Sequence, residues 1–335
     1  MIDVKHLTKY FGPVMAIDNV TFQVDRGEIV GFLGPNGAGK TTTMRILTSY
    51  LPATSGIARV AGYDVMTQSM DVRRHIGYLP ESVPLYTEMR VEEYLTFRAK
   101  LQGVGRKERP QRIEYCMDRC RVREVRRRLI GTLSKGYRQR VGLADAMIHD
   151  PPILILDEPT TGLDPVQIRE TLALILELGQ SHTILLSTHI LAEVEAICER
   201  VIIINSGRVS VSRTLADLEA QSVIVIEARG PAEQIAGTLR GTDGVLSVTV
   251  KALGDGLSRF EVRPADGRDL REALCEKLTR KGWTLRRLEM QRRTLEQAFF
   301  DVLREENPLR EAPAIRPGGG EAVQDLAGQA AAKKD

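Results

Sequence analysis

The sequence contains little cysteine and no long apolar run. Its 4 cysteines are scattered and too few for a disulfide framework, which favours a reducing compartment. The longest apolar stretches, such as Ile153–Leu156 and Val201–Ile204, fall far short of the roughly 20 residues that a membrane-spanning helix needs. The N-terminal residues mix charged and apolar side chains and lack the layout of a signal peptide. We therefore expect a chain that does not span a membrane and stays in the cytoplasm.

The composition excludes a fibrous chain and disorder of the chain as a whole. Hydrophobic residues make up 42% and charged residues 27%, close to the average for soluble globular proteins. A length of 335 residues exceeds one ordinary domain of about 100–200 residues, so two folded units are expected. The net charge of +3 does not discriminate between classes of partner.

The first unit has the pattern of an α/β fold. From Ile2 to about Thr214, short β-branched runs alternate with helical patterns, which is typical of a sheet with helices on its faces. The apolar run Ile29–Leu33 leads directly into glycines and predicts a buried strand that ends in a functional loop. Helical spacing replaces the strand signal after Val91. We place this domain at residues 1–220, with a helical subdomain at about 88–148.

A second pattern covers residues 221–304. Its strands and helices are expected in the order β-α-β-β-α-β, which is the plan of a ferredoxin-like α+β domain. A closing helix at Leu295–Leu303 is expected to pack on this domain. Residues 305–335 are rich in proline, glycine and alanine, and this composition predicts a disordered tail.

A glycine-rich segment between a predicted strand and a predicted helix indicates phosphate binding. Gly34–Thr41 fits the pattern G-x-x-x-x-G-K-[ST]. Glycines allow successive backbone N–H groups to surround phosphate oxygens, and the start of a helix adds its positive dipole end. Lys40 would reach the β- and γ-phosphates, and the Thr41 hydroxyl would hold Mg²⁺. The candidate nucleotide-binding residues here are Gly34, Pro35, Asn36, Gly37, Ala38, Gly39, Lys40, Thr41 and Thr42.

Two adjacent carboxylates, Asp157 and Glu158, follow the apolar run Ile153–Leu156. An acidic residue at the end of a buried strand is the Mg²⁺ ligand of P-loop enzymes, which is the role predicted for Asp157. Glu158 would polarise the attacking water. The alternative is a strand that simply enters a polar loop, and the upstream phosphate loop disfavours it.

Further motifs complete an ordered set. Leu133–Tyr137 (LSKGY) precedes the two carboxylates, Gly162–Pro165 (GLDP) follows them, and His189 follows the later strand. Phe11 lies just before Gly12. With this set, residues 1–207 resemble the ATP-binding subunit of an ABC transporter, which implies a P-loop ATPase fold.

The resemblance implies roles for these residues. Phe11, or the neighbouring Tyr10, would stack on adenine, and His189 would hydrogen-bond the γ-phosphate. Ser134 and Gly136, in the segment Leu133–Tyr137, would hold the γ-phosphate bound to a second subunit. Two copies would therefore dimerise around two Mg²⁺-bound ATP molecules and loosen after hydrolysis.

The sequence departs from the common family pattern. Glu81 stands where most relatives carry glutamine, so it is a candidate to ligate Mg²⁺, directly or through water, and to act near the attacking water. Lys135 and Tyr137 replace the commonest glycine and glutamine. These departures, with Pro84–Tyr86, resemble the branch that serves ABC-2-type exporters, including gliding-motility-associated and copper-maturation ATPases. Thr294–Phe299 resembles the closing helix of the accessory domain in that branch.

The resemblance implies a peripheral protein at the cytoplasmic face of the inner membrane. A separate integral membrane permease and a second ATPase subunit, with a homodimer expected, would be its partners, and no nucleic acid is expected. The basic stretch Arg119–Arg128, with Arg286, Arg287, Arg292 and Arg293, leaves open an ATPase that acts on ribosomes or nucleic acid. A standalone ATP switch that binds a small molecule is a third interpretation. Cys116 and Cys120 are expected to pack between helices and not to hold a metal. The transported substrate is not predictable.

Overall fold

The computed structural model describes residues 1–219, 222–265, 268–291 and 294–305. The predicted tail lies outside these residues except for its first one, as do Arg292 and Arg293 of the basic set. Within the described part, no helix is both long and apolar enough to cross a bilayer.

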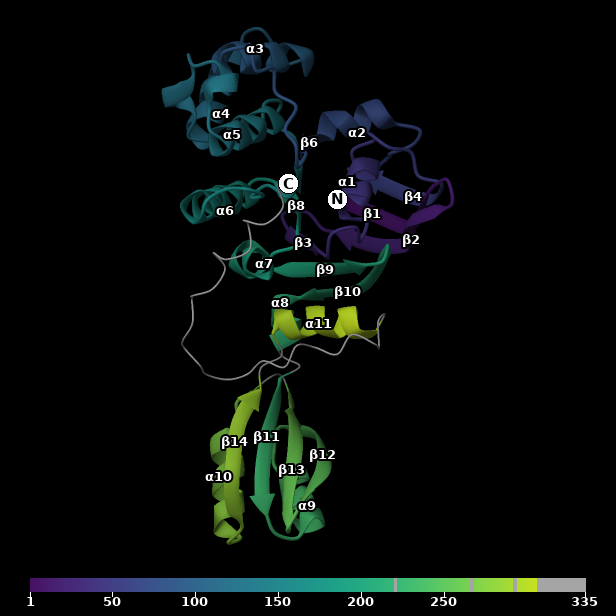
Figure 1. The fold of residues 1–335 in the computed structure, drawn as a ribbon, viewed down its shortest axis with the longest axis vertical. Helices are drawn as coiled ribbons and strands as arrows, with labels where there is room; N and C mark the ends of the chain where they lie inside the picture. Colours follow the sequence, from purple (N-terminus) through teal and green to yellow (C-terminus); the bar gives the residue numbers. More distant parts are fainter. Residues whose placement is uncertain (220–221, 266–267, 292–293, 306–335) are drawn as a thin grey trace, which may run out of the picture.

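Near-continuous apolar runs form a central six-stranded sheet (Figure 1). Its strands in spatial order are β10 (Arg208–Thr214), β9 (Arg200–Asn205), β3 (Ile29–Leu33), β8 (Thr183–Thr188), β7 (Ile153–Asp157) and β6 (Ile76–Leu79). All residues of β3, β7 and β8 are buried, as expected for parallel strands covered on both faces. Leu33 pairs with Thr188 and Asp157 with Ser187, so the carboxyl ends of these strands meet at one edge.

A smaller antiparallel sheet from the N-terminal part of the chain packs against the central one. Its order is β2 (Val14–Val24), β1 (Ile2–Phe11), β4 (Ser55–Val60) and β5 (Tyr63–Asp64). Helix α1 (Lys40–Leu47) contacts β2, β4 and β7 and thus joins both sheets. Phe22 and Phe32, whose ring centroids lie 5.4 Å apart, belong to the shared core. Helix α2 (Ser69–His75) precedes β6.

The predicted helical insertion forms a bundle of three α-helices. These are α3 (Val91–Leu101), α4 (Arg109–Arg119) and α5 (Lys135–Ala146), with short 3₁₀ turns at Arg123–Val125 and Ile130–Thr132. Cys116 and Cys120 are free, buried thiols in its core, and the Cys120 Sγ lies 3.7 Å from the Met147 Sδ. Outside this bundle, helix α6 (Pro165–Gly179) follows β7, and helix α7 (Leu191–Ile197) follows β8.

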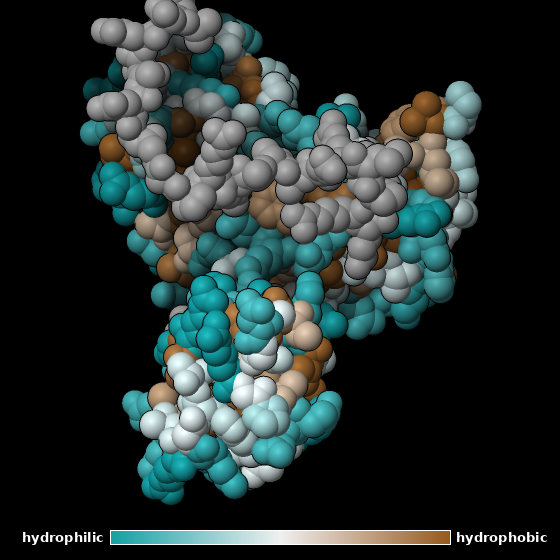
Figure 2. All heavy atoms as spheres, turned by 60° about the horizontal axis from the view of Figure 1, so that its bottom comes forward, coloured by the Kyte–Doolittle hydropathy of each residue, from teal (hydrophilic) through white to brown (hydrophobic). Residues whose placement is uncertain are grey.

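The last sheet confirms the predicted ferredoxin-like order. Its strands are β12 (Val245–Gly254), β13 (Leu257–Pro264), β11 (Val223–Arg229) and β14 (Thr284–Gln291), all antiparallel. Helices α9 (Ala232–Arg240) and α10 (Arg271–Arg280) pack on it around a core that includes Ile226, Leu239, Phe260 and Leu274. We call this sheet with its two helices the accessory unit. It projects from the larger body, and its visible surface is largely hydrophilic (Figure 2).

The closing helix packs elsewhere than predicted. Helix α11 (Leu295–Glu305) forms, but it contacts α7, α8 (Leu215–Glu219) and β9 (Figure 1). Its apolar stripe, Leu295, Ala298 and Val302, belongs to the core around the central sheet and not to that of the accessory unit. The physical reason is that α9 and α10 already cover one face of the accessory sheet. The apolar side chains of α7 and β9, by contrast, are covered by the apolar stripe of α11.

Candidate functional site

The phosphate loop (Gly34–Thr41) connects the buried strand β3 to α1. Gly37 and Gly39 have φ values of +81° and +104°, which side chains rarely adopt, and a Cβ on Gly39 would lie 2.8 Å from the carbonyl oxygen of Ala16. Lys40 is buried, and its Nζ donates hydrogen bonds to the carbonyl oxygens of Gly34 (2.8 Å) and Pro35 (3.2 Å). The loop therefore fixes the positively charged Lys40 ammonium at the start of α1.

Asp157 ends β7 next to this loop. Its Oδ1 accepts hydrogen bonds from the hydroxyls of Thr41 (3.3 Å) and Ser187, while its Oδ2 is buried without a hydrogen-bond partner among the described residues. Burial raises the pKa of the Asp157 carboxyl above its ordinary value, since burial disfavours the charged form. A bound cation would satisfy such an oxygen.

Glu158 turns away from the strand in the left-handed conformation, with φ of +50°. Its backbone N–H donates to Ser187, and its side chain meets two groups from other elements. The Oε1 lies 3.4 Å from the Lys40 Nζ, and the Oε2 lies 2.8 Å from the Nδ1 of His189. One carboxylate thus joins the phosphate loop to the end of β8.

Lys40, Thr41, Glu158 and His189 line a cavity of about 390 Å³, whereas Asp157 lies behind Thr41 and outside its lining. The lining residues are Ala16, Asn36, Gly37, Gly39, Lys40, Thr41, Thr42, Glu81, Glu158, Thr161 and His189. The structure therefore brings Glu81, from the segment after β6, to the same space as Glu158 and His189. Ala16 and Thr161 were not predicted, and neither was the contact of Ser187 with Asp157. No local motif marks Ala16, because only the position of β2 brings it to the loop.

Some predicted residues lie outside this cavity. Gly34, Pro35 and Ala38 belong to the phosphate loop without lining the cavity, and Gly34 instead approaches the carbonyl oxygen of Ile204. Phe11 lies at the end of β1, is 47% exposed and has the Lys9 Nζ 5.2 Å from its ring centroid. Its ring is accessible for stacking but is not part of the cavity lining.

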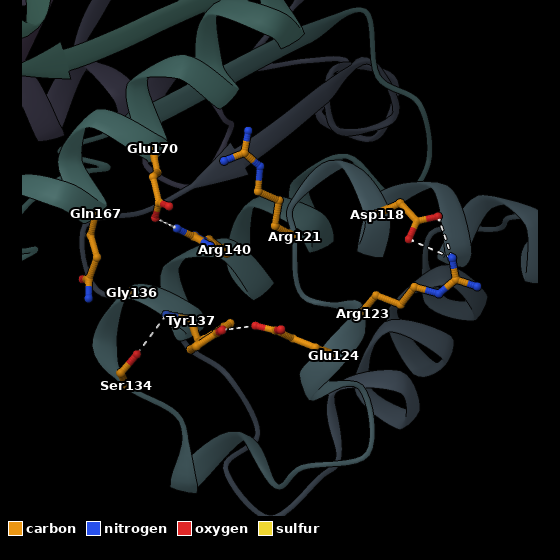
Figure 3. A pocket seen from close by; sticks show the side chains of 10 residues that line it. All are labelled: Asp118, Arg121, Arg123, Glu124, Ser134, Gly136, Tyr137, Arg140, Gln167 and Glu170. Atoms are coloured by element: carbon orange, nitrogen blue, oxygen red, sulfur yellow. Dashed lines mark hydrogen bonds and ion pairs between the residues drawn. The ribbon is translucent and has the colours of Figure 1, made fainter.

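The signature segment (Leu133–Tyr137) lines a different cavity, of about 800 Å³, at the start of α5 (Figure 3). Ser134 caps this helix, its Oγ accepting a hydrogen bond from the Tyr137 N–H at 3.4 Å. The Tyr137 hydroxyl bonds Glu124. A Cβ on Gly136 would lie 2.5 Å from the Gln167 Oε1, so glycine keeps this surface open. Within one chain, Ser134 and Gly136 therefore do not join the cavity at the phosphate loop.

A family described as "ABC transporter" matches residues 17–161. The uncharacterized ABC transporter ATP-binding protein YxlF of Bacillus subtilis (strain 168) is 34% identical over 304 residues, which cover 90% of this chain and 99% of that relative. The chain belongs to the ABC transporter ATP-binding proteins. The predicted ATPase family is thereby confirmed.

The chain is also similar to other ABC transporter ATP-binding proteins, in sequence and in structure. The bacitracin transport ATP-binding protein BcrA of Bacillus licheniformis is 37% identical over 210 residues, covering 62% of this chain and 68% of that protein. The dimeric structure of the bacterial ABC transporter cassette MJ0796 has a TM-score of 0.59 at 26% identity, covering 64% of this chain and 99% of that one. This ABC protein is accordingly an ATP-binding ATPase subunit.

Proposed function

We propose that two copies of this chain close around two Mg²⁺-bound ATP molecules and drive a separate membrane permease from the cytoplasmic face of the inner membrane. The observation that carries the proposal is the meeting of Lys40, Glu158 and His189 in one cavity at the carboxyl edge of the central sheet. We assign ATP hydrolysis to residues 1–220, including the helical subdomain at 88–148, and an accessory role to residues 221–304.

ATP would lie along the phosphate loop. Its β- and γ-phosphates would replace the carbonyl oxygens of Gly34 and Pro35 as partners of the Lys40 ammonium. The backbone N–H groups of residues 36–42 would surround the phosphate oxygens at the start of α1. The exposed ring of Phe11 would stack on adenine.

The residues present fit Mg²⁺. Oxygen is the ligand atom that this ion prefers, and the buried Oδ2 of Asp157 has no other partner among the described residues. Thr41 and Asp157 would hold the ion, and Glu81, which lines the cavity together with Thr41, would add a third oxygen. When bound, Mg²⁺ supplies positive charge that neutralises phosphate oxygens.

Glu158 would accept a proton from the water that attacks the γ-phosphate. Its φ of +50° and its contacts with Lys40 and His189 hold the carboxylate toward the cavity. The His189 Nδ1 lies 2.8 Å from this carboxylate, so the imidazole would present its Nε2 to a γ-phosphate oxygen.

The second copy would supply the signature segment. Ser134 and Gly136 lie on a surface separate from the phosphate loop of their own chain, so a γ-phosphate could meet them only across a dimer interface. The start of α5 would contribute its dipole to that contact. The dimeric MJ0796 cassette supports this arrangement.

A groove of about 980 Å³ is the proposed docking place for a cytoplasmic segment of the permease. It runs between α2 and α3, and exposed apolar side chains of Tyr50, Met70 and Leu101 line it. Pro80, also in its lining, immediately precedes Glu81, so an occupant would contact the segment that enters the ATP cavity. The similarity to BcrA supports transport, and we propose export from the resemblance to the ABC-2 branch.

The test is a nuclease-treated pull-down of tagged Glu158→Gln chain with ATP from gently solubilised membranes of its source cell. A polytopic membrane protein should co-purify in stoichiometric amount, and Leu101→Asp, which places a charge in the groove, should reduce its recovery. Recovery of ribosomal or other soluble partners alone would contradict the transporter role. It would favour the alternative of an ATPase that acts on ribosomes or nucleic acid.

A further inference from the structure

Glu193 is a buried carboxylate that the proposed chemistry does not use. It lies on α7 and is 2% exposed. Its Oε1 accepts a hydrogen bond from the Thr160 hydroxyl and its Oε2 one from the Thr188 hydroxyl, each at 2.6 Å. Both threonines are buried as well. These lengths are those of charge-assisted hydrogen bonds.

The two threonines lie next to the two residues, Glu158 and His189, that meet in the proposed ATP cavity. Thr160 is two residues after Glu158, and Thr188 immediately precedes His189. The Thr188 hydroxyl also accepts a hydrogen bond from the backbone N–H of Ile190 (3.1 Å), so it fixes the turn on which His189 lies. One carboxylate therefore connects the segment after β7 to the last residue of β8.

Packing of α7 does not need this carboxylate. Val194 and Ile197 hold the helix in the core, and Val194 lies against Gly31 of β3. Burying a carboxylate costs free energy that an apolar side chain would not cost, and two hydroxyl donors only offset it. The presence of a buried carboxylate at position 193 is thus explained by its hydrogen bonds to the two segments and not by the packing of α7.

We infer that Glu193 is a positioning residue: through Thr160 and Thr188 it sets the 2.8 Å contact between the Glu158 carboxylate and the His189 imidazole. This inference rests on the proposed roles of Glu158 and His189. Without the hydrogen bonds of Glu193 to Thr160 and Thr188, the two segments can separate. A displacement of about 1 Å at a reacting group lowers the rate by up to roughly a hundredfold.

The test measures steady-state ATP hydrolysis and nucleotide affinity of the purified full chain. Glu193→Ala should lower kcat between about tenfold and a hundredfold, with KM for ATP nearly unchanged, because the phosphate loop is untouched. Glu193→Gln should restore most of the rate, since an amide accepts from one hydroxyl and donates to the other. Glu195→Ala, at an exposed position of the same helix, is the matched control and should keep full activity.

A second pair of variants separates positioning from folding. Thr160→Val with Thr188→Val should reproduce the loss of kcat, and adding Glu193→Ala should reduce it little further, because the three residues act as one unit. The triple variant leaves no buried carboxylate without donors and carries the test if Glu193→Ala does not fold. A parallel loss of ATP affinity and turnover that Glu193→Gln does not restore would overturn the inference.

The failure of the inference and that of the proposed function are distinguishable. If Glu158→Gln abolishes turnover while Glu193→Ala and the threonine variants keep it, only the role of Glu193 is wrong. If Glu158→Gln itself keeps full turnover, the proposed catalytic assignment is wrong.

Discussion

At the scale of single residues, Asp157 links stability to pH. Burial holds its folded-state pKa above the ordinary value of 3.8, so the folded protein binds this proton more tightly than the unfolded chain does. The resulting stabilisation is fully present below pH 3.8 and is lost as the pH rises through the folded-state pKa. At neutral pH the ionised carboxylate therefore lowers the free energy of unfolding.

Asp157→Asn should accordingly raise the free energy of unfolding of the nucleotide-free chain at pH 7, because it removes the buried negative charge. The gain should shrink as the pH falls toward about 4, because the wild-type carboxyl is then protonated. Thermal unfolding followed by circular dichroism at several pH values measures both effects. The exposed Asp243→Asn is the control and should change neither. A gain for Asp157→Asn that does not depend on pH would contradict the explanation.

At the scale of elements, sequence patterns predicted those elements that form from residues adjacent in the chain. The apolar run Ile29–Leu33, the glycines after it and the helix from Lys40 determine the phosphate loop almost by themselves. The partner of α11 was not predictable in this way, because its apolar stripe is compatible with either core. The contact of Glu193 with Thr160 also escaped prediction, since it joins residues 33 positions apart that are polar and unremarkable in sequence.

The position of α11 predicts which part of the molecule it stabilises. Val302→Asp places a charge in the core around the central sheet and should lower the free energy of unfolding of the ATPase body by about 2–4 kcal/mol. Trp283, the single tryptophan, packs on the accessory unit near Ile235, so its fluorescence reports on that unit. Denaturant unfolding should show ATP binding lost earlier than in the wild type, with the Trp283 transition nearly unchanged. Phe300→Asp, at an exposed position of α11, is the control. A shift of the Trp283 transition alone would contradict the observed packing.

At the scale of the whole molecule, the two halves of the proposed ATP site lie on separate surfaces, and this predicts nucleotide-dependent assembly. Glu158→Gln should bind ATP without hydrolysing it, and ultracentrifugation should show a dimer with Mg²⁺-ATP and a monomer with ADP. Gly136→Asp added to it should keep the chain monomeric, because its carboxylate at the start of α5 would repel the γ-phosphate held by the other copy.

Gly136→Asn, also added to Glu158→Gln, is the matched control for that charge, since its side chain meets the same Gln167 side chain but is neutral. It should dimerise like Glu158→Gln alone, and ATP affinity should be equal in all three chains because the phosphate loop is unchanged. Dimerisation of the Gly136→Asp double variant would exclude the signature segment from the interface. If Glu158→Gln binds ATP but stays monomeric at every concentration tested, the second copy is not held by nucleotide, and the permease alone would have to bring the two ATPase subunits together.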